Sequence, residues 1–205
     1  MEWYLAVLLF AVSSVITPGP NNIMIMSSGL NFGIRRSIPH FLGILVGLSL
    51  MVASVGLGMA SLFKAAPQLH PVIQIVGVIY LLYFAWLVAT SEDIDTSCKK
   101  AISFTQAVVF QWVNPKAWVI ATGAIAAFTT AESQIALQVT YIASAFALAS
   151  IPCLGTWLFC GSFLSRHLKQ PKFRQFFNRT MAGLLVISIV PIIVELAIEF
   201  FKVII

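Results

Sequence analysis

Charged residues are scarce in this chain. Lysine, arginine, aspartate and glutamate make up 9% of its 205 residues, whereas an ordinary soluble domain contains about 25%. Hydrophobic residues make up 60% of the chain, and apolar runs recur along its whole length. This composition excludes a soluble globular domain and predicts an integral membrane protein.

Cysteine and histidine are also scarce, with three of each. An odd set of cysteines does not predict a disulfide framework. A site that binds a metal needs carboxylates, imidazoles or thiolates close together, but His40, His70 and His167 stand at or near loops. Cys153 and Cys160 form the one soft pair, and two buried cysteines are more often packing residues. We expect no cofactor and no resident metal.

Apolar runs of about 20 residues, the length that crosses a bilayer, predict six membrane spans. The run that begins near Trp3 is longer than a signal-peptide core and has no basic start, so we expect it to be a true span. The spans are predicted over residues 3–28, 38–63, 69–90, 104–129, 134–162 and 180–201.

The basic residues predict the orientation of these spans. The net charge of +5 could suit nucleic acid, but most of the charge lies in short loops, so we expect no nucleic-acid partner. The second and fourth loops together contain one basic residue, Lys64. The first, third and fifth loops hold Arg35, Arg36, Lys99, Lys100, Arg166, Lys169, Lys172, Arg174 and Arg179. Loops rich in lysine and arginine stay in the cytoplasm, so both termini are expected outside.

The polar loop from Ser91 to Ser103 divides the spans into two groups of three. We expect a first three-helix repeat over residues 1–92, a cytoplasmic linker loop over 93–103 and a second repeat over 104–205. An odd number of spans in each half inverts the second half relative to the first, as in inverted-repeat transporters. The predicted fold is therefore an all-α membrane protein of six helices in two inverted repeats.

The first span of each repeat is interrupted near its middle by a polar residue followed by proline. Pro18 and Pro20 lack backbone N–H groups and flank the flexible Gly19, so no regular helix continues through them. Asn114 and Pro115 repeat the pattern in the fourth span. Matched breaks of this kind indicate a binding site near the middle of the membrane, whereas a single break is more often a kink packed dry between helices.

Each break leaves a new helix N-terminus, whose amides suit an anionic group such as a carboxylate. Uncharged polar side chains flank both breaks. The predicted substrate-binding residues are Thr17, Pro18, Gly19, Pro20, Asn21, Asn22, Asn114, Pro115 and Lys116.

Lys116 is the only basic residue well inside a span. A charge at that depth is costly, which predicts a functional residue that faces a cavity. Lys116 could hold a substrate carboxylate, pair with Glu195, or lose its proton and take part in proton coupling; a lysine that only reaches a wet vestibule is the alternative. Glu195 in the last span is the candidate for proton coupling, with a satisfied interfacial glutamate as the equal alternative.

Two further features predict packing and lipid contact. Gly43 and Gly47 have the spacing of small residues that lets helices approach closely. We expect them to pack inside the fold, with a homodimer face as the alternative. The fifth loop, from Arg166 to Arg179, mixes basic residues with phenylalanines. Ordinary loop topology explains these charges, and an amphipathic segment on anionic lipid is the alternative.

Taken together, these motifs resemble the lysine exporter (LysE/RhtB) family of bacterial amino-acid efflux proteins, over essentially the full length of the chain. The motifs that carry the resemblance are Thr17 to Asn22, Gly33, Arg35, Gly43, Gly47 and Asn114 to Lys116. The resemblance implies six spans in the bacterial inner membrane and export of amino acids or close derivatives, driven by the proton gradient. Members include exporters of lysine, arginine, homoserine, threonine, leucine and cysteine or O-acetylserine.

The chain looks more like the neutral amino-acid branch, because its interior has one conspicuous cation and little acid to hold a basic side chain. We therefore expect secondary export of a zwitterionic amino acid. Efflux of a metal ion is the alternative. An intramembrane enzyme needs a nucleophile with a base, or a metal cluster, and the spans show neither. A purely structural subunit would leave Lys116 and two broken helices without a purpose.

Overall fold

The computed structural model describes residues 2–59, 69–90, 101–130, 134–167 and 171–204, and the elements in these ranges are all helical. The expectation of an all-α protein is confirmed. By length and composition, two described helical stretches are long and apolar enough to cross a membrane, Pro20–Gly58, which turns at Gly33, and Ile135–Leu164. The elements are α1 (Glu2–Ile16), α2 (Pro20–Ser54), the π-helix η1 (Val55–Met59), α4 (Leu69–Ala89), α5 (Phe104–Val113), α6 (Pro115–Phe128), α7 (Ile135–His167) and α8 (Pro171–Ile204).

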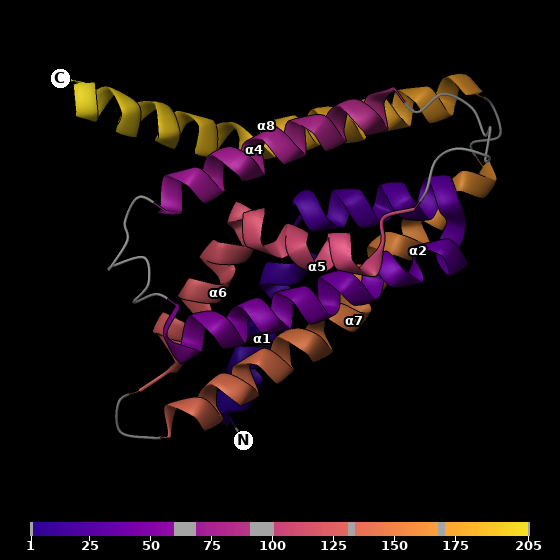
Figure 1. Ribbon diagram of the computed structural model, residues 1–205. Coiled ribbons are helices and arrows are strands. Elements are labelled where there is room, and N and C mark those ends of the chain that lie inside the picture. The colour runs from indigo at the N-terminus through magenta and orange to yellow at the C-terminus, as the bar shows by residue number, and fades with distance from the viewer. Residues whose placement is uncertain (1, 60–68, 91–100, 131–133, 168–170, 205) are drawn as a thin grey trace.

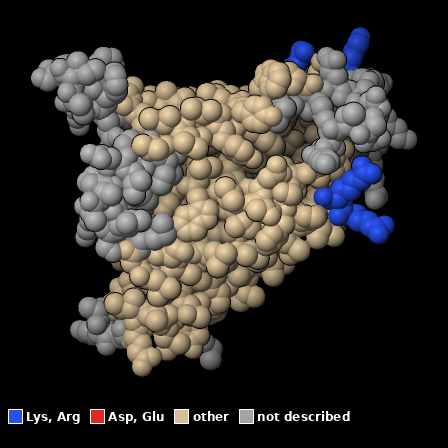
Figure 2. All heavy atoms as spheres, viewed as in Figure 1, with Lys and Arg blue, Asp and Glu red and all other residues tan. Residues whose placement is uncertain are grey.

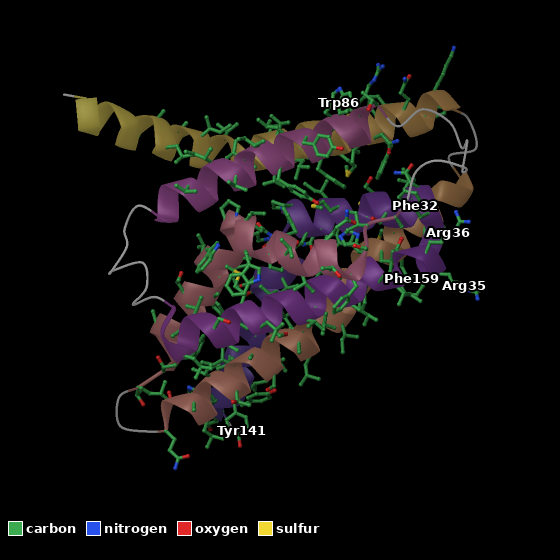
Figure 3. The ribbon with its side chains drawn as sticks, viewed as in Figure 1. Phe32, Arg35, Arg36, Trp86, Tyr141 and Phe159 are labelled. Carbon is green, nitrogen blue, oxygen red and sulfur yellow. The ribbon has the colours of Figure 1, made fainter. Side chains whose placement is uncertain are left out.

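The helices form a bundle with a second layer on one side (Figure 1). The long helices α2 and α7 pack against each other in the bundle, where α1 contacts α7 and α5 contacts α2. Helices α4 and α8 lie side by side and form the second layer. Trp86, Tyr141 and Phe159 point away from the bundle (Figure 3), and each is exposed. Large apolar side chains on the outside fit a protein surrounded by lipid tails.

Both predicted proline breaks are present. Helix α1 ends at Ile16 and α2 begins at Pro20. Helix α5 ends at Val113, and α6 begins at Pro115 after Asn114, whose backbone is extended (φ −86°, ψ 108°). Each proline takes the first position of a new helix, where a missing N–H group is not needed. Local proline chemistry therefore fixes both interruptions.

The expected first loop is reduced to one residue, which corrects the span boundaries 3–28 and 38–63. Helix α2 continues through this region, and within it only Gly33 leaves the helical conformation, with φ 72° and ψ 176°. The two parts of α2 fold back on each other there. A buried hydrogen bond of 2.8 Å between the hydroxyl of Ser28 and Nδ1 of His40 joins them. Glycine alone adopts this backbone region readily.

We predict that Gly33→Ala lowers the stability of the protein by about 1–3 kcal/mol, the cost of holding another residue in this region. A Cβ built at Gly33 meets nothing within 4 Å, so crowding plays no part. Gly183→Ala in α8 is the matched control, since its Cβ also enters open space and its backbone has no positive φ. Thermal unfolding in detergent measures both variants, and equal melting temperatures would refute the prediction.

The expected fifth loop is also mostly helical, which is a second correction. Helix α7 continues to His167 and α8 begins at Pro171, so the predicted span 180–201 is part of a longer helix. Residues 171–179 belong to α8 and do not form a separate interfacial helix. The third loop lies largely outside the described residues, and the two expected repeats are taken up below.

Gly43 and Gly47 pack inside the fold, as predicted. A Cβ built at Gly43 would lie 2.5 Å from the carbonyl oxygen of Phe104, and one at Gly47 would lie 2.7 Å from Cγ of Gln111. Both glycines therefore let α2 approach the backbone of α5 closely. A homodimer would have to use another surface.

The visible lysine and arginine side chains gather at one end of the molecule (Figure 2). Arg35 and Arg36 follow the turn at Gly33, and Tyr141 lies at the opposite end (Figure 3). The rings of Trp3 and Tyr4 pack edge to face against Tyr141. Basic residues are typical of the cytoplasmic interface of a membrane protein, and tyrosine and tryptophan are typical of either interface.

Candidate functional site

The two proline breaks are in contact through Lys116. Its Nζ donates to the carbonyl oxygen of Thr17 at 2.6 Å, to Oγ1 of Thr17 at 2.8 Å and to the carbonyl oxygen of Pro18 at 3.3 Å. The lysine stem lies across Gly19, where a built Cβ would be 2.7 Å from Cδ of Lys116. A larger residue at this position would force the stem to move.

The lysine ammonium has three donors, and each has an oxygen of the first break as its acceptor. The charge pair with Glu195 that the sequence suggested is therefore not needed to satisfy Lys116. Glu195 lies on α8, with a side chain outside the described part of the chain. The structure thus gives Lys116 two backbone oxygens and a hydroxyl as hydrogen-bond acceptors.

The first break supplies these oxygens because α1 has ended. The last carbonyls of a helix have no partner within it, and they carry partial negative charge. The Thr17 hydroxyl donates to the carbonyl of Ser14 at 2.8 Å. Its lone pairs stay available to accept from Lys116.

Two more side chains satisfy the end of α1. The buried amide of Asn22 donates to the carbonyls of Val15 at 2.7 Å and Thr17 at 2.8 Å. Nε1 of Trp157 on α7 donates to the carbonyl of Ile16 at 3.1 Å. Every carbonyl from Val15 to Pro18 therefore accepts a hydrogen bond from a side chain, so the break is a defined structure.

A reciprocal amide pair forms a second link between the breaks. Nδ2 of Asn21 donates to Oε1 of Gln111 at 2.8 Å, and Nε2 of Gln111 donates to Oδ1 of Asn21 at 3.1 Å. Gln111 is fully buried on α5. Sequence reasoning missed it, although an amide one turn before Asn114 in an apolar span was a signal, because a buried amide is costly unless it is paired.

Asn114 has a structural task that the sequence did not reveal. Its buried side-chain oxygen accepts from the backbone N–H of Lys116 at 3.2 Å. This is the N-cap interaction that starts α6. Asn114 therefore positions Lys116, and Pro115 follows the cap as the first residue of the helix.

A small cavity of about 20 Å³ lies between the breaks. Its polar residues come from both breaks and the last turn of α1, and its apolar ones from α1, α2, α6 and α7. The lining consists of Ser14, Val15, Gly19, Asn21, Asn22, Ile44, Leu48, Asn114, Lys116, Ala117, Ile120 and Leu154. This volume holds about one water molecule. A larger ligand can enter only if the breaks move apart.

Of the predicted site residues, Gly19, Asn21, Asn22, Asn114 and Lys116 line this cavity. The others adjoin it. Thr17 and Pro18 are exposed and hold the lysine ammonium, whereas Pro20 and Pro115 open their helices. The structure therefore brings the two predicted groups of residues together, about 100 positions apart in the sequence.

The soft pair weighed for a metal does not share one environment. Cys153 is buried, with Sγ 3.9 Å from the carbonyl of Val12, and Cys160 is exposed. His40 bonds to Ser28 at the turn of α2. Among the residues that the structure describes, no group of three histidine, cysteine or acidic side chains could hold a metal ion. This part of the chain offers no support for metal-ion efflux.

We predict that Gln111→Leu or Asn21→Leu alone lowers stability by about 1–3 kcal/mol, because each leaves the opposite amide without its partner. The double variant should lose less than the sum of the two, since it removes both amides together. Thermal unfolding of the wild type and the three variants in detergent measures this coupling. Strict additivity would show that the pair contributes nothing.

Comparison with known proteins gives one family and several relatives. A model of the LysE type translocator family matches residues 12–199. A cysteine/O-acetylserine efflux protein of Klebsiella pneumoniae subsp. pneumoniae is 30% identical over 196 residues, which cover 93% of this chain and 96% of the relative. A protein of the same description from Escherichia coli (strain K12) is 30% identical over 184 residues, covering 86% and 90%. No solved structure matches the chain.

Proposed function

The chain belongs to the LysE type translocator family, and from this premise we propose that it exports a neutral, zwitterionic amino acid or derivative through the site between its two breaks. Efflux transporters of this family are membrane proteins of the bacterial inner membrane and are not enzymes. The names of the relatives support export of an amino acid. The observation that carries the proposal is the contact of both proline breaks through Lys116.

The proposed architecture has six spans in two inverted repeats, over residues 1–92 and 104–205, joined by the linker 93–103. The first and fourth spans are α1 with the start of α2, and α5 with α6. In this assignment α5 corresponds to α1, and α7 corresponds to the part of α2 that follows Gly33. The packing supports it, because α1 contacts α7 and α5 contacts that part of α2 at Gly43 and Gly47. An inverted two-fold axis relates such pairs.

The proposed substrate site uses the residues from Thr17 to Asn22 and from Asn114 to Lys116. The N-terminal ends of α2 and α6 and the charge of Lys116 favour a carboxylate. Among the described residues that line the cavity, none is acidic, so a basic substrate side chain would find no counter-charge there. A neutral amino acid fits this balance.

Alternating access requires the two halves to move, because the cavity of about 20 Å³ is too small for an amino acid. We place the basic end of the molecule in the cytoplasm and both termini outside, which the distribution in Figure 2 supports. Coupling to the proton gradient, with Glu195 as the proton carrier, rests on the family resemblance.

Counterflow in proteoliposomes tests the proposed function. Vesicles loaded with one unlabelled amino acid should accumulate the same labelled amino acid when it is neutral, and lysine or arginine should exchange poorly. Vesicles that contain metal salts measure the alternative under the same conditions. A monodisperse protein that exchanges no member of a broad amino-acid panel would contradict the proposal.

A further inference from the structure

We infer that the oxygens of Thr17 and Pro18 form the subsite for the substrate's α-ammonium group, and that Lys116 fills this subsite when no substrate is bound. The inference deepens the proposed function and rests on it. It assigns to the first break a ligand group, an alkylammonium, that the sequence did not suggest. It also gives Lys116 two alternating partners.

The geometry of the subsite is that of an ammonium site. Three oxygens converge on Nζ of Lys116 at distances from 2.6 to 3.3 Å, and an ammonium has three donors. None of the oxygens belongs to a carboxylate, so the subsite attracts a cation through two carbonyls just beyond the end of α1 and one hydroxyl. Such a shell binds a primary ammonium on any short stem. Thr17 and Pro18 are exposed, so a ligand can reach them.

Lys116 and a substrate ammonium cannot occupy the subsite together. A substrate ammonium that enters the subsite would leave Lys116 without its acceptors. A zwitterion supplies a new acceptor, because it carries a carboxylate as well as an ammonium. The substrate ammonium takes the three oxygens, and Lys116 turns to the carboxylate. Each charged group keeps a partner throughout, and an unpaired charge within a membrane span is costly. The net charge of the protein is unchanged by the exchange.

The exchange also connects binding to movement. The subsite belongs to the first half of the chain, whereas Lys116 is the second residue of α6 in the second half. While Lys116 holds the oxygens of Thr17 and Pro18, it ties the two breaks together around the small cavity. Release of the lysine by a zwitterion removes this tie. An amine alone would leave Lys116 without a partner, and an N-acetylated amino acid has no ammonium for the subsite.

The test uses ethylamine as a probe that has an ammonium but no carboxylate. Lys116→Met vacates the subsite, so ethylamine hydrochloride should raise the melting temperature of this variant in detergent and leave that of the wild type unchanged. Sodium chloride at the same concentration is the ionic control. Thr17→Val added to Lys116→Met removes one oxygen and should weaken ethylamine binding about tenfold. Ethylamine that binds neither protein, or both equally, would overturn the inference.

A second arm keeps Lys116 in place. Thr17→Val alone should raise the amino-acid concentration needed for half-maximal counterflow about tenfold, because one ammonium acceptor is lost. An unchanged value would overturn the inference even if Lys116→Met does not fold. If both arms give the contradicting result but the wild-type protein still exchanges amino acids, only the inference is wrong and the proposed function is retained. If the wild-type protein exchanges no amino acid, the proposed function is itself contradicted.

Discussion

Lys116→Met is expected to reduce amino-acid export at least about thirtyfold, since loss of one partner of a hydrogen-bonded charge pair costs about 2 kcal/mol or more. In the proposed cycle the lysine holds the first break when the site is empty and the substrate carboxylate when it is filled. Methionine has a similar stem but can do neither. Initial rates of counterflow in proteoliposomes measure the loss.

Two other substitutions make this result specific. Lys172→Met removes an exposed basic residue near the start of α8 and should leave the rate unchanged. Lys116→Arg keeps the charge, but the wider guanidinium has to cross Gly19, where the lysine stem already fills the available space. We expect export to fall in this variant as well. Full export by Lys116→Met would show that the lysine is not part of the transport site.

Gly161→Val is expected to prevent correct assembly of the protein. A Cβ at Gly161 would collide with the backbone carbonyl of Met26, in the part of α2 that begins at the first break. Overpacking of a core costs about 1–3 kcal/mol when side chains can adjust, and here a backbone group would have to move. We therefore expect at least the upper end of this range, seen as loss of the monodisperse peak in size-exclusion chromatography.

Gly155→Val on the same helix is the matched control for this substitution. A Cβ at Gly155 meets nothing within 4 Å, so this variant should be produced and should melt like the wild type. The difference between the two variants isolates the contact of α7 with α2. Equal behaviour of both would mean that α7 does not approach α2 closely at Gly161.

The proline breaks could be predicted from the sequence because their cause is local. Pro20 and Pro115 lack the N–H group that a continuous helix needs, wherever the rest of the chain lies. The turn at Gly33 could not be predicted in the same way. A glycine permits a positive φ without requiring it, so the polar and basic residues around it, from Asn31 to Ser37, indicated a longer loop than the structure contains.

The partner of Lys116 was beyond sequence reasoning for a different physical reason. A search for partners by residue type finds Glu195, because carboxylates are distinctive. Backbone carbonyls are present at every residue and become strong acceptors only where a helix ends. The end of α1 and the start of α6 had to be placed side by side before these oxygens could be assigned. The pairing of Asn21 with Gln111 was hidden in the same way, because it depends on how α2 and α5 pack.

A structure determined with the exported amino acid bound is the most direct test of the shared site between the two breaks. We predict that the substrate ammonium lies on the oxygens of Thr17 and Pro18, and that Nζ of Lys116 has moved to the substrate carboxylate. The cavity between the breaks should be larger than the present volume of about 20 Å³. A substrate bound elsewhere, with Lys116 still on Thr17, would contradict the mechanism.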